Sequence, residues 1–160
     1  MKKVLLIAVF AIFGLGTVNA QGFSGGANIG LPVGDASNGS SISFGADVLY
    51  MFNADEDFTY GAASGFQYFL GKTVNGISLP NTSYLPIAGA ARYALSDQFS
   101  AGLDLGLAFI MSGGSGSGLY YKPMVVYNLS DTMKLNAYYS GVNITGGSLS
   151  IVGAGIMFDF

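Results

Sequence analysis

The 160-residue chain contains no Cys, His or Trp, and few charges. The absence of Cys excludes a disulfide framework, a thiolate metal site and a thiol nucleophile. The absence of His removes the commonest general base and metal ligand, so the usual Ser–His hydrolase site is missing. Charged residues make up 9% of the chain, against about a quarter in soluble domains. We therefore expect that the protein is not an enzyme, binds no cofactor or metal, and lacks the surface of an ordinary water-soluble domain.

Apolar residues and glycine are abundant instead. Hydrophobic residues reach 51% of the chain, and Gly occupies 25 positions. The length favours a single domain, large enough for a sizeable core or a closed barrel. No long, uninterrupted apolar run occurs after the first twenty residues, so no transmembrane helix is expected there.

The first twenty residues have the pattern of a secretory signal peptide. Lys2 and Lys3 precede the apolar run VLLIAVFAIFGLG, and the small residues of Val18–Ala20 follow at cleavage spacing. A membrane anchor is the alternative, but the run is shorter than the roughly 20 apolar residues of a span. We expect a signal peptide over residues 1–20 and a mature domain over residues 21–160. Its 4 basic against 9 acidic residues give a net charge of −5, which argues against a nucleic-acid partner.

The mature chain alternates bulky and small residues with the period of a β-strand. In Phe99–Phe109, written FSAGLDLGLAF, every odd position except Ala101 is Phe or Leu, and the even positions are small or acidic. Turn signals divide the chain into eight such runs. Short connectors (Asn53–Asp57, Ser96–Gln98, Ser130–Thr132) alternate with connectors richer in Gly and Ser, which begin at Gly34, Gly71, Ser112 and Asn143. The pattern predicts an all-β fold, an eight-stranded antiparallel up-and-down barrel.

The composition of the two strand faces indicates which side meets water. A secreted soluble barrel or sandwich would carry Lys, Glu, Thr and Arg on the face opposite the bulky residues. That face instead holds mostly Gly, Ala and Ser, which suit the narrow interior of an eight-stranded barrel. The bulky face then points outward into lipid. Aromatic residues cluster toward both strand ends, as in the girdles of transmembrane barrels.

Pro86 and Pro123 fall inside predicted strands, where we expect bulges.

The C-terminal segment GIMFDF adds a family resemblance. With the signal peptide and the alternating strands, it resembles the small outer-membrane β-barrels of Gram-negative bacteria, including the OmpA-like and OmpX-like barrels. The resemblance covers the whole mature chain. It implies localisation in the outer membrane, contact with outer-membrane lipid, and recognition by the outer-membrane assembly machinery. In that family a terminal aromatic residue with apolar residues at alternate upstream positions is the insertion signal, which Ile156, Phe158 and Phe160 match.

Four charged residues fall on the predicted inner face: Asp47, Arg92, Asp104 and Lys122. Pairing across the Ser96–Gln98 turn puts Arg92 opposite Gly102 and diagonal to Asp104, within side-chain reach. We expect Arg92 to be held by Asp104, with Asp47 as a second partner. Because unpaired buried charges are costly, a structural network explains these residues better than an ion path or a catalytic carboxylate pair.

The sequence also contains an acidic turn and a set of large inward side chains. Asp55–Asp57 holds three adjacent carboxylates, but the ligand spacing of a calcium loop is absent, which favours a solvated turn. The interior is predicted to be filled by a set of large inward side chains: Leu49, Phe69, Tyr84, Tyr120, Met124, Tyr138 and Met157. The predicted function is a structural or interaction role in the cell envelope, with an extracellular or envelope partner. The alternative is a small carrier or leak channel for an apolar or ionic solute.

Overall fold

The computed structural model describes residues 22–52, 57–74 and 76–160. The predicted signal peptide, residues 1–20, lies outside the described residues. Asp55 and Glu56 of the acidic turn also lie outside them. Among the described residues, no helix is long and apolar enough to cross a membrane.

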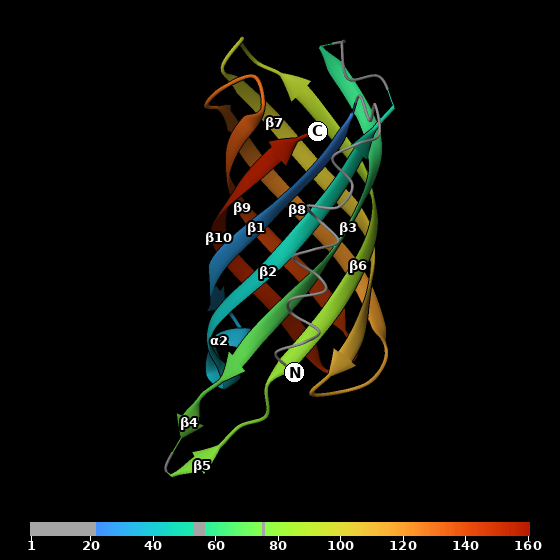
Figure 1. Ribbon diagram of the computed structural model, residues 1–160. Helices are drawn as coiled ribbons and strands as arrows, with labels where there is room; N and C mark the ends of the chain where they lie inside the picture. Colours follow the sequence, from blue (N-terminus) through green and yellow to red (C-terminus); the bar gives the residue numbers. More distant parts are fainter. Residues whose placement is uncertain (1–21, 53–56, 75) are drawn as a thin grey trace.

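In this part of the chain, eight long antiparallel strands close into a barrel (Figure 1). Each long strand pairs with its neighbour in sequence, and the last strand pairs with the first. The predicted eight-stranded up-and-down barrel is therefore confirmed. The long strands are β1 (Phe23–Val33), β2 (Ser40–Met51), β3 (Phe58–Gly71), β6 (Thr82–Ala94), β7 (Phe99–Ser112), β8 (Ser117–Asn128), β9 (Met133–Ile144) and β10 (Gly147–Asp159).

The connectors divide the barrel into a turn end and a loop end. The turn end carries residues 95–98 and 129–132 together with the C-terminus, and the loop end carries residues 34–39, 72–81, 113–116 and 145–146. Two loop-end connectors contain short elements, the helical turn α2 (Ala36–Gly39) and a hairpin of β4 (Thr73–Val74) and β5 (Ile77–Ser78). Figure 1 shows both at the end opposite the C-terminus, with the hairpin projecting beyond the barrel.

The sequence predicts plain loops for both of these connectors. A signal for the hairpin was present, because Asn75 and Gly76 between β-branched residues are typical of a two-residue hairpin turn. Gly76 has a φ of +81°, which non-glycine residues rarely adopt.

The expectation of bulges at Pro86 and Pro123 is wrong. The pairs Ser64↔Ile87 and Gln67↔Tyr84 keep one register on either side of Pro86, and the register around Pro123 is likewise unbroken. The irregularities lie near the loop end instead, at Ser40/Ile42 and Ser83/Tyr84. A proline removes one N–H donor while its fixed φ remains compatible with an extended strand. At Pro86 the Ser64 hydroxyl donates to the proline carbonyl oxygen, 2.8 Å away.

The outward face of the strands is apolar. Leu31 is 63% exposed, Ile87 58% and Leu105 52%, and these bulky side chains alternate with buried or small inward residues. Among the described strand residues, no Asp, Glu, Lys or Arg lies on this outward face. The arrangement contradicts the soluble-barrel alternative, because an exterior of this kind is stable in lipid rather than in water.

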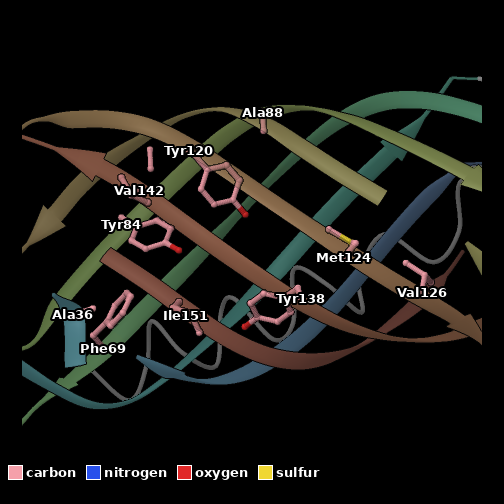
Figure 2. Packing of buried hydrophobic residues seen from close by; sticks show 11 residues of the cluster. Ala36, Phe69, Tyr84, Ala88, Tyr120, Met124, Val126, Tyr138, Val142 and Ile151 are labelled. Carbon is pink, nitrogen blue, oxygen red and sulfur yellow. The ribbon is translucent and has the colours of Figure 1, made fainter. Parts of the chain in front are cut away.

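The inward face forms the core, in two apolar clusters. The larger cluster extends from Ala36 of α2 and Phe69, at the loop end, to Val126 near the turn-end terminus of β8 (Figure 2). The smaller cluster, toward the turn end, contains Leu49, Met51 and Ala90. Of the large side chains predicted to point inward, six are buried and Met157 is partly buried.

Glycine on one strand makes room for a large inward side chain on the next. Gly102 pairs with Arg92, and a Cβ at Gly102 would lie 2.6 Å from Arg92 Cδ. Gly153 pairs with Tyr138, and its Cβ would lie 2.6 Å from the Tyr138 hydroxyl oxygen and 2.5 Å from the Ile29 carbonyl oxygen. Each contact is closer than real Cβ atoms show, so the missing side chain is required by packing.

We predict that Gly153→Ala destabilises the folded barrel by about 1 to 3 kcal/mol, because overpacking displaces the Tyr138 ring. The measurement is the free energy of unfolding in urea, with the protein in lipid or detergent. Gly89→Ala is the matched control, since a Cβ there faces outward and meets only the Leu105 carbonyl oxygen at 3.9 Å. Equal effects of the two substitutions would contradict the packing role of Gly153.

Candidate functional site: a charged layer inside the barrel

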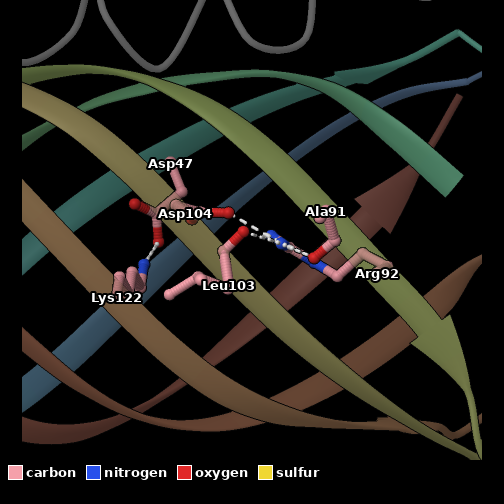
Figure 3. A network of polar contacts seen from close by, with 6 residues as sticks. All are labelled: Asp47, Ala91, Arg92, Leu103, Asp104 and Lys122. Atoms are coloured by element: carbon pink, nitrogen blue, oxygen red, sulfur yellow. Dashed lines mark hydrogen bonds and ion pairs between the residues drawn. The ribbon is translucent and has the colours of Figure 1, made fainter.

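The four inner-face charges predicted from the sequence come from four different strands. Asp47 lies on β2, Arg92 on β6, Asp104 on β7 and Lys122 on β8. Each occupies an inward position because strand side chains alternate between the two faces. The structure brings all four together inside the barrel, as the two ion pairs of a charged layer (Figure 3).

The first ion pair joins neighbouring strands. Arg92 Nη1 lies 2.7 Å from Asp104 Oδ1, and the two side chains are 13% and 6% exposed. The same nitrogen donates to the carbonyl oxygens of Ala91, at 2.9 Å, and Leu103, at 3.3 Å. Arg92 pairs with Gly102, so the predicted register and diagonal contact are confirmed. The guanidinium is thereby fixed by a carboxylate and by backbone oxygens together.

The second ion pair crosses the barrel. Lys122 Nζ lies 2.8 Å from Asp47 Oδ2, although β8 and β2 are not neighbouring strands. Lys122 also lies 4.5 Å from the centre of the Tyr138 ring, within cation–π distance. The expectation that Asp47 is a second partner of Arg92 is therefore wrong. Asp47 neutralises Lys122 instead, because the lysine stem is long enough to span the narrow interior.

Two neutral residues extend this layer: Asn28, which the sequence did not indicate, and Tyr138, which it predicted only as a large inward side chain. Asn28 Nδ2 donates to Asp47 Oδ2 at 2.8 Å, and the Tyr138 hydroxyl donates to Asn28 Oδ1 at 2.9 Å. Asn28 pairs with Gly45, which puts Asp47 at the diagonal position. This is the geometry that predicts the contact between Arg92 and Asp104, so the same rule could have found Asn28.

A small cavity of about 10 Å³ borders the charged layer. Its lining includes both ion pairs together with Tyr120 and Asn136. Asn136 Oδ1 is buried, and none of the described residues donates a hydrogen bond to it. A cavity of this size holds one water molecule at most. With two positive and two negative groups, the layer is electrically balanced.

The predicted assembly signal lies where the barrel closes. Ile156 and Phe158 are on the outward face of β10, paired with Ala27 and Gly25 of β1. Phe160 follows β10; its backbone N–H donates to the Phe23 carbonyl oxygen at 3.0 Å, and the two rings lie 5.9 Å apart. The last residues therefore hold the first and last strands together at the turn end.

No metal centre is formed by the part of the chain that the structure describes, which contains no group of three or more potential ligands. Of the acidic turn, only Asp57 is among the described residues.

No protein-family model and no curated protein matches the chain. Among solved structures, the N-terminal β-barrel domain of Pseudomonas aeruginosa OprF is similar over 88% of this chain and 98% of that domain, with a TM-score of 0.59 and 12% identity. Yersinia pestis Ail in a bilayer nanodisc is similar over 88% of this chain and 100% of that one, with a TM-score of 0.58 and 16% identity.

A third similar structure is Neisserial surface protein A, which is similar over 89% of this chain and 100% of that one, with a TM-score of 0.53 and 21% identity. The chain has the fold of the small outer-membrane β-barrels. At these identities the similarity establishes the fold of this chain and not its activity.

We predict a strong energetic coupling between Arg92 and Asp104. Arg92→Met alone leaves a buried carboxylate unpaired, at a cost of about 3 to 5 kcal/mol, and Asp104→Leu leaves an unpaired guanidinium. The double variant Arg92→Met/Asp104→Leu should lose clearly less stability than the sum of the single losses. The measurement is the free energy of unfolding of all four proteins in a double-mutant cycle.

The half-exposed ion pair between Lys134 and Asp159 provides the control for this cycle. The corresponding cycle, Lys134→Met with Asp159→Leu, should give a coupling below about 1 kcal/mol because water screens the pair. Strictly additive losses at Arg92 and Asp104 would reject their interaction.

Proposed function

We propose that this protein is an integral outer-membrane barrel without enzymatic activity, which has a structural or interaction role in the cell envelope. The observation that carries the proposal is the distribution of charge. In the described strands every charged side chain faces inward, and the charged residues of the layer form ion pairs, while the outward face is apolar. This distribution fits a cylinder surrounded by lipid, so the first partner of the protein is the membrane itself.

We further propose that the interior is filled and does not conduct. Three observations support this proposal: the large buried side chains of the inner face, the balanced charged layer, and the cavity of only about 10 Å³ beside it. A small carrier or leak channel remains the second candidate, because a charged layer at mid-barrel is also where an ion would pass if the pairs separated.

The contact surface for an envelope or external partner would be the loop end. One of the similar structures is Ail in complex with the heparin analogue sucrose octasulfate. The loop-end connectors of the present chain contain one basic residue, Lys72, and one acidic residue, Asp35. The loop end of this protein therefore lacks the cationic surface that would bind a polyanion of that kind, and we do not extend this ligand to the present protein.

Recordings in planar bilayers test the filled interior. We predict no steady single-channel conductance for the wild-type protein, because side chains occupy the inner face along its length. A parallel assay with apolar solutes should detect no saturable binding inside the barrel. Steady conductance would reject the filled interior. Saturable binding of an apolar solute that is lost on substitution of interior residues would favour the carrier.

We also propose that Ile156, Phe158 and Phe160 form the signal that the outer-membrane assembly machinery recognises. Phe160→Ser should then lower the amount of protein inserted in cells severalfold while detergent refolding stays near wild-type yield. Phe99→Ser is the matched control, because Phe99 is another exposed aromatic residue at the turn end, whose ring lies 5.0 Å from that of Tyr127. Equal insertion of the Phe160 and Phe99 variants would count against recognition.

A further inference from the structure

An open cavity of about 320 Å³ lies at the loop end of the barrel. Three segments that are far apart in sequence border it: α2, the linker between β5 and β6, and the start of β10 after the last loop. Its volume lies within the range of about 300 to 1,000 Å³ of small-molecule sites, which often occupy the mouths of barrels. None of the charged-layer residues lines this cavity.

The cavity has an apolar base. Ile144 and Leu149 line it and pack against the buried cluster of the barrel interior. Ala36 of α2 is itself part of that cluster, so α2 is anchored at the side of the cavity. Leu79 and Pro80 contribute further apolar surface from the linker. An alkyl chain of a ligand would be removed from water here.

Asp35 is the one charged residue of the described cavity lining. Its Oδ2 accepts hydrogen bonds from the Ser148 backbone N–H at 3.1 Å and from the Ser148 hydroxyl at 3.3 Å. Among the described residues, no donor reaches Oδ1, and Asp35 takes part in none of their ion pairs. Asp35 is exposed, and a carboxylate has about four acceptor sites, so sites remain on it for a donor other than Ser148.

The nearest basic side chain in the connectors does not neutralise Asp35. Lys72 Nζ donates to the Ser37 carbonyl oxygen at 2.8 Å, which fixes the lysine to α2. An anionic ligand would be repelled by the Asp35 carboxylate. A metal ion would find one carboxylate and scattered hydroxyl groups, which is less than a hard-cation site provides.

We propose that this cavity is a binding site for a small organic cation, with its ammonium group on Asp35 and its apolar chain against Ile144 and Leu149. The ammonium supplies the donors and the positive charge that the Asp35 carboxylate lacks, and the chain covers the apolar base. The site goes beyond the proposed envelope role, because its occupancy requires neither conduction nor a protein partner.

The test compares n-butylammonium with 1-butanol on the full mature barrel in lipid nanodiscs. We expect n-butylammonium to cause saturable NMR shifts of the Ala36, Gly147 and Ser148 amides, and 1-butanol to bind at least tenfold more weakly. Comparable shifts with both compounds, or no saturable shift with n-butylammonium, would overturn the proposal.

Asp35→Asn removes the charge but keeps an oxygen that can accept from Ser148. It should weaken n-butylammonium binding at least tenfold, whereas Asp97→Asn, the same charge change at the turn end, should leave it unchanged. Leu79→Ser provides a second test that leaves Asp35 in place, and it should weaken binding while preserving the preference for the amine. An equal loss with Asp97→Asn would show a long-range charge effect and reject the site.

Discussion

The width of an eight-stranded barrel is the constraint on which the rest of this structure depends. Closing eight strands leaves an interior just wide enough for side chains. Large residues fit inside where the neighbouring strand contributes glycine, as Gly102 does beside Arg92 and Gly153 beside Tyr138. These two inward glycines therefore serve packing, because a side chain at either position would overlap the large residue on the neighbouring strand.

The same width determines how the charges are arranged. In a narrow interior Lys122 reaches Asp47 on the far wall, while Arg92 reaches Asp104 on the adjacent strand. Each pair compensates part of the cost of removing ions from water. Asn28 donates a hydrogen bond to Asp47 and accepts one from Tyr138, and Tyr138 belongs to the larger apolar cluster, so the two residues link the charged layer to that cluster. Closed packing and balanced charge are thus two results of one geometric limit.

Local rules predict the parts of this structure that depend on neighbouring strands. Alternation of side chains gives the eight strands and their outward face, and antiparallel register gives the contact between Arg92 and Asp104. The contact between Lys122 and Asp47 could not be predicted this way, because it joins strands that share no hydrogen bonds. Proline was misleading for a physical reason: it removes one N–H donor, but its fixed φ is compatible with an extended strand, so β3 and β6 keep one register on either side of Pro86.

The filled interior that we propose would exclude mobile water. Magnetisation transfer from water to protein in bilayer-embedded samples measures this directly by solid-state NMR. We expect the inner-face residues Ala88, Tyr120 and Val142, all buried, to receive no transfer from mobile water. The exposed loop-end residues Gly114 and Ser115 should receive it rapidly. Rapid transfer along the whole inner face would show a water-filled pore and contradict the filled interior.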